Sequence, residues 1–180
     1  MPNYSESLPE LFGRVSKAET QEEKIALLRA HKHTKSLHTI LQGAFHPDIV
    51  WELPEGPPPY KKDEGEYGIN PSVLERELRK LVYFTSRTGK LIKNKMKREE
   101  IFVSMLESMH PSESELIIQM KDKRIDGLTA RLVWEFMPGL IPEPAPEPDP
   151  EPEPVAVSVN LGPRPKTKPN KKRTKKNTDG

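Results

Sequence analysis

The chain has 180 residues, with 29 Lys plus Arg against 27 Asp plus Glu for a net charge of +2, and it contains 20 prolines and no cysteine. The lack of cysteine excludes disulfides, thiolate nucleophiles and Cys-based zinc sites. No apolar run approaches the roughly 18 residues that a membrane span needs, and the first residues lack a basic stretch followed by an apolar one, so we expect a cytoplasmic protein without membrane contact.

Composition divides the chain into three parts. Residues 142–180 hold ten of the 20 prolines and no aromatic residue, too little apolar surface to offset the entropy of ordering them. Residues 143–154 carry five acids and no base, residues 163–180 carry eight bases and one acid, and residues 1–142 sum to zero. We therefore predict a helical domain over residues 1–142, a Glu/Pro-rich extended linker over 143–162, and a disordered basic tail over 163–180.

Three short helices are predicted in the first part of the domain. Residues 8–15 form an N-terminal turn that carries Leu11, Phe12 and Val15. Thr20 and Glu23 make a capping box that opens a second helix. A third helix is capped by Thr34 or Ser36, buries Leu37, Ile40, Leu41 and Ala44, and stops before Pro47. Residues 47–70 then form a long connection, and loops of that length are often functional.

Four helices are predicted after this connection. The clearest opens at residues 70–72, is apolar at Leu74, Leu78, Leu81, Val82 and Thr85, and ends at Gly89. A second helix covers residues 95–109, and a third begins at Pro111. The fourth runs from a cap at Thr129 to Pro138. No alternation of period two appears before residue 142. The pattern predicts an all-α fold, a compact array of six or seven short helices with a long Pro-rich internal loop.

The sequence offers no chemistry that points to an enzyme, a metal or a cofactor. His31, His33 and His38 lie within eight residues, but the i, i+2 spacing of His31 and His33 does not place two imidazoles on one helical face, and no carboxylate lies at a matching offset. The string TSRTGKL lacks the first glycine and the Ser or Thr of a phosphate-binding loop, and there is no nucleophile elbow. The densest group of acidic side chains is expected on solvated helix faces and not in an active site. These residues are Glu99, Glu100, Glu107, Glu113 and Glu115.

Residues 53–60, LPEGPPPY, form what we call the Pro-rich segment. Together with the preceding tryptophan it is rigid and aromatic enough to dock on a protein partner, as proline-rich ligands do. The residues proposed for such binding are Trp51, Leu53, Pro57, Pro58, Pro59 and Tyr60. We favour the alternative, in which Trp51, Leu53 and Tyr60 pin this loop onto the helices of their own domain.

Residues 87–98, which we call the basic turn, hold six bases and no acid. With the tail, the turn predicts phosphate contacts to DNA or RNA with steep salt dependence. Neither basic cluster contains an aromatic residue, so base stacking is not expected and binding would be sequence-tolerant. The alternative, a solubilising tail and an exposed turn, has equal weight. The proposed contact residues are Arg87, Lys90, Lys93, Lys95, Lys97, Arg98, Lys171, Lys172, Arg173, Lys175 and Lys176.

The order of motifs resembles a family of small uncharacterised proteins encoded by tailed bacteriophages. The motifs are EEKIALLRAH, ILQGAFHPDIVWELPEGPPPY, KREEIFVSMLESMHPSESELIIQMKDK and GLTARLVWEFMPGLIP. The resemblance covers about residues 8–142 and is most specific in residues 53–60, 98–110, 121–123 and 127–138. Relatives have a longer turn where this chain has only residues 124–126, and the tail lies outside the shared region. The resemblance implies a non-enzymatic phage protein that acts in the host cytoplasm.

Two functions follow from these observations. The first is a helical binding module that associates with nucleic acid through the basic turn and tail. The second is a structural or assembly protein of the virion that binds a phage or host protein through the Pro-rich segment.

Overall fold

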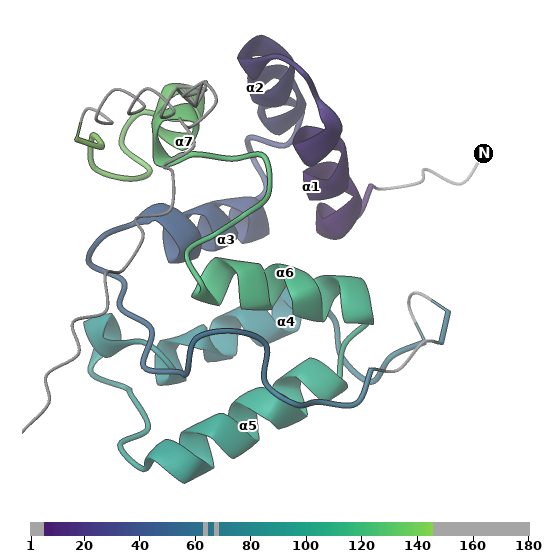
Figure 1. Cartoon of the computed structure of the whole chain (residues 1–180), viewed down its shortest axis with the longest axis vertical. Coiled ribbons are helices and arrows are strands. Elements are labelled where there is room, and N and C mark those ends of the chain that lie inside the picture. The colour runs from purple at the N-terminus through teal and green to yellow at the C-terminus, as the bar shows by residue number, and fades with distance from the viewer. Residues whose placement is uncertain (1–5, 63–64, 67–68, 146–180) are drawn as a thin grey trace, which may run out of the picture. The chain divides into compact units, whose positions relative to one another are not determined.

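The computed structural model describes residues 6–62, 65–66 and 69–145, and these residues contain seven α-helices and two 3-10 helices with no strand (Figure 1). The all-α fold is therefore confirmed for the described part of the chain. The elements are α1 (Leu8–Lys17), α2 (Gln21–Ala30), α3 (Lys35–Phe45), α4 (Leu74–Glu77), η1 (Leu78–Tyr83), η2 (Ser86–Thr88), α5 (Lys95–Glu107), α6 (Pro111–Lys121) and α7 (Ala130–Phe136).

The chain divides into two units, Met1–Pro146 and Glu147–Gly180. The predicted basic tail, and the predicted linker from residue 146 onward, lie outside the described residues. None of the described helices is both long and apolar enough to cross a bilayer.

Local capping signals place the first helices where the sequence predicts them. The backbone N–H of Glu23 donates to Thr20 Oγ1 at 3.2 Å, which forms the predicted capping box of α2. A second capping box, between Ser7 and Glu10, opens α1. Each box satisfies backbone donors that a helix otherwise leaves unpaired in its first turn. The predicted apolar stripes are buried as expected, including Leu11, Val15 and Leu28 at 0% exposure.

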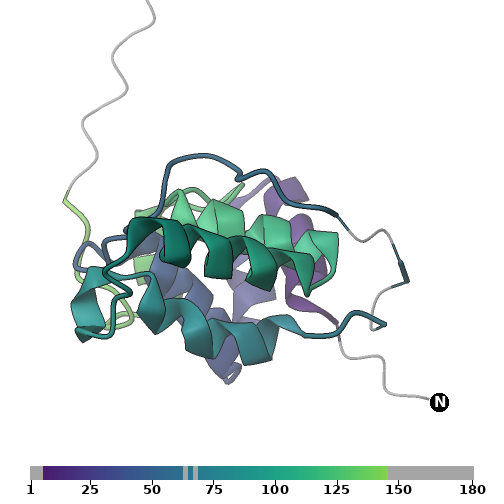
Figure 2. The same ribbon diagram turned by 90° about the horizontal axis from the view of Figure 1, so that it is seen from below.

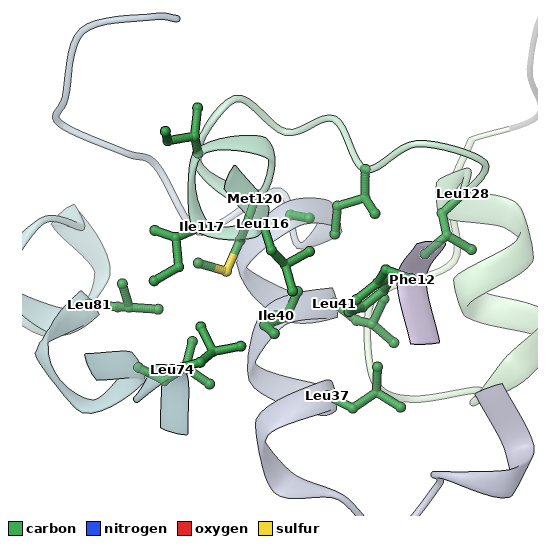
Figure 3. Packing of buried hydrophobic residues seen from close by; sticks show 14 of the residues in the cluster. Phe12, Leu37, Ile40, Leu41, Leu74, Leu81, Leu116, Ile117, Met120 and Leu128 are labelled. Carbon is green, nitrogen blue, oxygen red and sulfur yellow. The ribbon is translucent and has the colours of Figure 1, made fainter. Parts of the chain in front are cut away.

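The hydrophobic core gathers around α3 and α6, which pack against each other (Figure 3). Figure 3 shows Leu116, Ile117 and Met120 of α6 converging on Ile40 and Leu41 of α3. The helical stripes of the two elements thus face one another, and α1, α7 and η1 close the core around them.

The prediction of one continuous α-helix from residue 70 to Gly89 is wrong. Its α-helical part, α4, is only four residues long, and the chain continues as the 3-10 helices η1 and η2. Gly89 does end the last helical turn, in the left-handed conformation with φ 67°. The predicted start at residues 70–72 is also wrong, because Val73 is the residue that precedes the helix.

Contacts from distant parts of the chain explain both differences. The backbone N–H of Leu74 donates to the buried Glu113 carboxylate at 3.2 Å, so a side chain of α6 caps α4. At the other end, Glu52 N–H donates to Phe84 O at 2.9 Å and Ser86 N–H donates to Val50 O at 3.1 Å. These bonds form an isolated antiparallel bridge between Trp51 and Thr85, which the chain can make only by leaving the helix.

The last three helices agree with their predicted positions. Asn94 caps α5 by accepting the Lys97 N–H at 3.1 Å, α6 begins at Pro111, and Thr129 caps α7. One expectation within them is wrong: Glu113 is not solvated but only 5% exposed. Its carboxylate is buried because it serves as the cap of α4.

The turn between α6 and α7 approaches α1 so closely that only glycine fits at position 127. Gly127 has φ +77°, and a Cβ there would lie 2.6 Å from the Ser16 Cα. We expect Gly127→Ala to lower the free energy of unfolding by about 2–4 kcal/mol, the combined cost of left-handed strain and overpacking. Urea denaturation of the full chain measures this loss.

Gly56→Ala is the matched control, because Gly56 has φ +80° but no atom within 4 Å of the added Cβ. It should lose only about 1 kcal/mol from the backbone strain. Equal losses in the two variants would contradict the close approach at Ser16.

Candidate nucleic-acid interface

The basic turn links η2 to α5 and exposes most of its cations. Arg87, Lys90, Lys93, Lys95 and Lys97 are all exposed. The turn is nevertheless fixed to η1, because the Ile92 N–H donates to Tyr83 O at 3.0 Å and Thr88 Oγ1 donates to Val82 O at 2.9 Å. Of these cations, Lys95 lies 3.8 Å from the Glu99 carboxylate. The turn therefore presents positive side chains from a defined backbone.

Arg98 differs from the other predicted contact residues of the turn. It is 7% exposed, and its guanidinium points inward. Nε donates to Glu52 O at 2.6 Å and Nη1 donates to Ile92 O at 2.6 Å. Arg98 thus ties the basic turn to the connection before the Pro-rich segment, and we leave it out of the proposed contact surface.

A groove of about 590 Å³ lies next to the basic turn, between the α4–η1 segment and α5. We call it the α4–α5 groove. One wall carries Arg76 and Lys80, and the other carries Lys97 together with Glu100 and Ser104. Lys97 belongs to the basic turn as well, so the groove and the turn form one continuous surface. The further lining residues are Pro71, Ser72, Glu77, Ile101, Met105 and Ser108.

Sequence reasoning did not identify Arg76 and Lys80 as part of the site. They are four residues apart, a spacing that puts two side chains on one face of an α-helix. This spacing was the one feature of the sequence that could have indicated a pair of neighbouring cations. The face of the α4–η1 segment that meets α5 depends on the cap that Glu113 of α6 gives to α4. A contact between distant residues of this kind cannot be seen in the sequence.

The electrostatics of the groove centre on the buried Glu77, which is 1% exposed. Ser72 Oγ donates to its Oε1 at 2.6 Å, and the Lys80 ammonium lies 3.0 Å from Oε1 and 2.8 Å from Oε2. A buried carboxylate needs such partners. Within the described residues neither Arg76 nor Lys97 forms an ion pair, so these two cations remain available to an anionic ligand.

The Pro-rich segment is held against the protein's own helices. Trp51 Nε1 donates to Gly43 O at 3.0 Å, and Trp51, Leu53 and Tyr60 pack against the core. Lys121 Nζ donates to Pro54 O at 2.7 Å and also contacts the Asp122 carboxylate. Three of the six residues proposed for partner binding are thus occupied by intramolecular packing.

The prolines of this segment lie on its outer side. Pro57 and Pro59 are exposed and Pro58 is half-buried. They border a hollow of about 340 Å³ whose other wall is α5, with Phe102 and Val103 among its lining residues. Figure 2 shows the loop running along α5 and α6.

Two pKa shifts accompany packing elsewhere in the domain. Burial raises the pKa of Tyr60, whose hydroxyl has no hydrogen-bond partner among the described residues, and the neighbouring Lys62 and Glu115 act in opposite directions on it. Burial lowers the pKa of Lys123, whose ammonium donates to His46 O at 2.8 Å. Neither residue lines the α4–α5 groove.

Two of the three histidines considered as metal ligands, His31 and His38, have other partners. His31 Nε2 lies 3.1 Å from the Glu6 carboxylate, and His38 Nε2 lies 2.7 Å from Lys32 O. Across the described residues there is no group of three or more His, Asp or Glu side chains placed to hold a metal ion.

The bonds of Arg98 yield a test of how the basic turn is positioned. In Arg98→Lys, a single ammonium replaces the two donors that reach Glu52 O and Ile92 O, so we expect the free energy of unfolding to fall by about 1–3 kcal/mol. The exposed Arg87→Lys, in the same turn, should change it by less than about 0.5 kcal/mol. Urea denaturation of both variants checks this, and an unchanged midpoint for Arg98→Lys would refute the positioning role.

Comparison with known protein families identifies the family to which the chain belongs. No curated protein matches the sequence significantly. The model of a family of unknown function, DUF6433, matches residues 11–127, which include α1 through α6 almost entirely, the Pro-rich segment and the basic turn. Because this match spans more than half of the chain, the protein belongs to the DUF6433 family.

Proposed function

We propose that this protein is a non-enzymatic helical module that binds nucleic acid through phosphate contacts. One observation carries the proposal: the exposed cations of the basic turn are continuous with those of the α4–α5 groove, through Lys97. A groove with cations on both walls is the arrangement that follows a phosphate backbone.

Binding on this surface would be driven by counterion release. Each phosphate that a Lys or Arg neutralises frees a condensed cation, so the logarithm of the affinity falls linearly with the logarithm of the salt concentration. Backbone contacts of this kind carry no sequence information. The proposed module therefore tolerates many sequences and takes DNA or RNA.

The tail adds charge to this proposal. Residues 163–180 carry eight bases and one acid, which supplies further phosphate contacts. The resemblance to proteins of tailed phages supplies the setting: a phage-encoded protein that acts on nucleic acid in the host cytoplasm.

The second candidate is a structural or assembly role in the virion through a protein partner. The exposed Pro57 and Pro59, beside a hollow lined by Phe102, favour it. The packing of Trp51, Leu53 and Tyr60 onto the core leaves this surface smaller than the sequence suggests. It is the first place to look for a partner if the protein binds no nucleic acid at moderate salt.

Charge reversal on the basic turn tests the proposal. In the full chain, Lys93→Glu, Lys95→Glu and Lys97→Glu together should weaken binding to duplex DNA by about 10- to 100-fold near 0.1 M salt. The slope of log affinity against log salt should shrink by about 2 to 3, because up to three phosphate contacts are lost. Fluorescence anisotropy over a salt series measures both, and circular dichroism checks that the fold is retained.

The matched control is Lys17→Glu, Lys32→Glu and Lys35→Glu, which changes the net charge equally at exposed positions near α1 to α3. A local interface requires this control to bind markedly better than the basic-turn variant. Equal weakening would show that only net charge matters and would overturn the assignment of the surface.

Deletion of residues 147–180 separates the domain from the tail. We expect the shortened chain to bind more weakly and with a smaller salt slope, and to lose further affinity when the basic turn is reversed. If the deletion alone abolishes binding, while the thermal unfolding of Met1–Pro146 is unchanged, the affinity belongs to the tail and not to the groove.

A further inference from the structure

Tyr83 is an exposed aromatic residue at the junction of the groove and the basic turn. Its exposed fraction is 41%, and no other Phe, Trp or Tyr among the described residues is comparably exposed. A tyrosine ring buries substantial apolar area when it finds a partner, so a ring left in water on a cationic surface is available for contact.

The geometry of η1 sets the position of this ring relative to the groove. In a 3-10 helix, side chains three residues apart lie one above the other. Lys80 and Tyr83 are three apart in η1, and Glu77, three residues before Lys80, ends α4. Glu77 and Lys80 both line the α4–α5 groove. Tyr83 therefore continues the row of residues along that wall, just beyond Lys80.

Tyr83 also adjoins the basic turn. Its carbonyl oxygen accepts the N–H of Ile92 at 3.0 Å, and Ile92 is followed by the exposed Lys93. The backbone of Tyr83 thus lies between Lys80 of the groove wall and the basic turn, and its ring is exposed there. Neither basic cluster contains an aromatic residue in sequence, but the backbone contact with Ile92 brings Tyr83 next to the basic turn.

We propose that Tyr83 is a stacking platform for an unpaired base and that the ligand of this surface is single-stranded nucleic acid. This inference rests on the proposed function and names its ligand class. A base within a duplex is covered by its neighbours, whereas a base in a single strand has a free π-face. Phosphates bound by Arg76, Lys93 and Lys97 hold the strand while one base stacks on the ring.

The test compares two substitutions at this position in the full chain. Tyr83→Leu keeps an apolar side chain but removes the ring, and Tyr83→Phe keeps the ring and serves as the conservative control. The probes are a fluorescein-labelled oligothymidylate of about 15 nucleotides, an oligouridylate of the same length, and a blunt duplex, each titrated at several salt concentrations.

Tyr83→Leu should weaken single-strand binding by about 5- to 100-fold, the effect of losing one base–aromatic stack, and should leave the salt slope unchanged because no phosphate contact is lost. Its effect on duplex binding should stay within about twofold. Tyr83→Phe should bind the single strand within about threefold of the unmodified chain. Comparison of oligothymidylate with oligouridylate gives the combined effect of the 2′-hydroxyl and the C5 methyl group.

Three results would overturn the inference. Unchanged single-strand binding by Tyr83→Leu excludes stacking on this ring, and an equal loss on duplex shows a general effect on the surface. If Tyr83→Phe binds the single strand as weakly as Tyr83→Leu, stacking on the face of the ring is not what stabilises the complex. If the unmodified chain binds duplex and the Lys-to-Glu variant does not, the proposed function survives any of these results, whereas an unmodified chain that binds none of the probes refutes both.

Discussion

The hydrogen bond from the Leu74 N–H to the buried Glu113 carboxylate is the contact on which the candidate site depends. It joins the start of α4 to the first turn of α6, and the Ser72 N–H reinforces it by donating to Ser108 O at the end of α5. These two bonds fix how the α4–η1 wall faces α5. The width of the groove, the direction of Arg76 and Lys80, and the place of Tyr83 all follow from that orientation.

A second set of tertiary bonds fixes the other end of the surface. Arg98 binds the carbonyls of Glu52 and Ile92, while the bridge between Trp51 and Thr85 holds the connection after α3 against the chain beyond η1. Residues 50–52, which precede the Pro-rich segment, and the basic turn are therefore not independent loops. Arg98 joins them, so the connection that leads into the Pro-rich segment also supports the backbone of the cationic surface.

The sequence predicted those parts of the fold whose signals are local. Capping boxes, Pro at a first helical position and stripes at helical spacing placed α1, α2, α3, α5, α6 and α7, because each depends on residues within a turn or two. It mispredicted the helix after Asn70, where Glu113 supplies the cap from another helix and where the backbone near Thr85 pairs with residues 50–52. Of the candidate site, the sequence predicted the exposed cations of the basic turn, but it did not predict the inward-pointing Arg98 or the neighbouring Arg76, Lys80 and Tyr83, since these depend on which surfaces meet.

The close approach of α3 to α6 has a consequence for how the family varies. A Cβ at Gly43 would stand 2.6 Å from the Met120 sulfur and 3.4 Å from Cζ2 of Trp51, whose indole N–H also binds the Gly43 carbonyl. A larger residue at position 43 is compatible with this core only if the Met120 side chain moves or is replaced, because the contact with Trp51 is close to an ordinary van der Waals distance. We therefore expect residue 43 and residue 120 to vary together in the family, and through the Gly43 carbonyl this pair also adjoins Trp51, the anchor of the connection that leads into the Pro-rich segment.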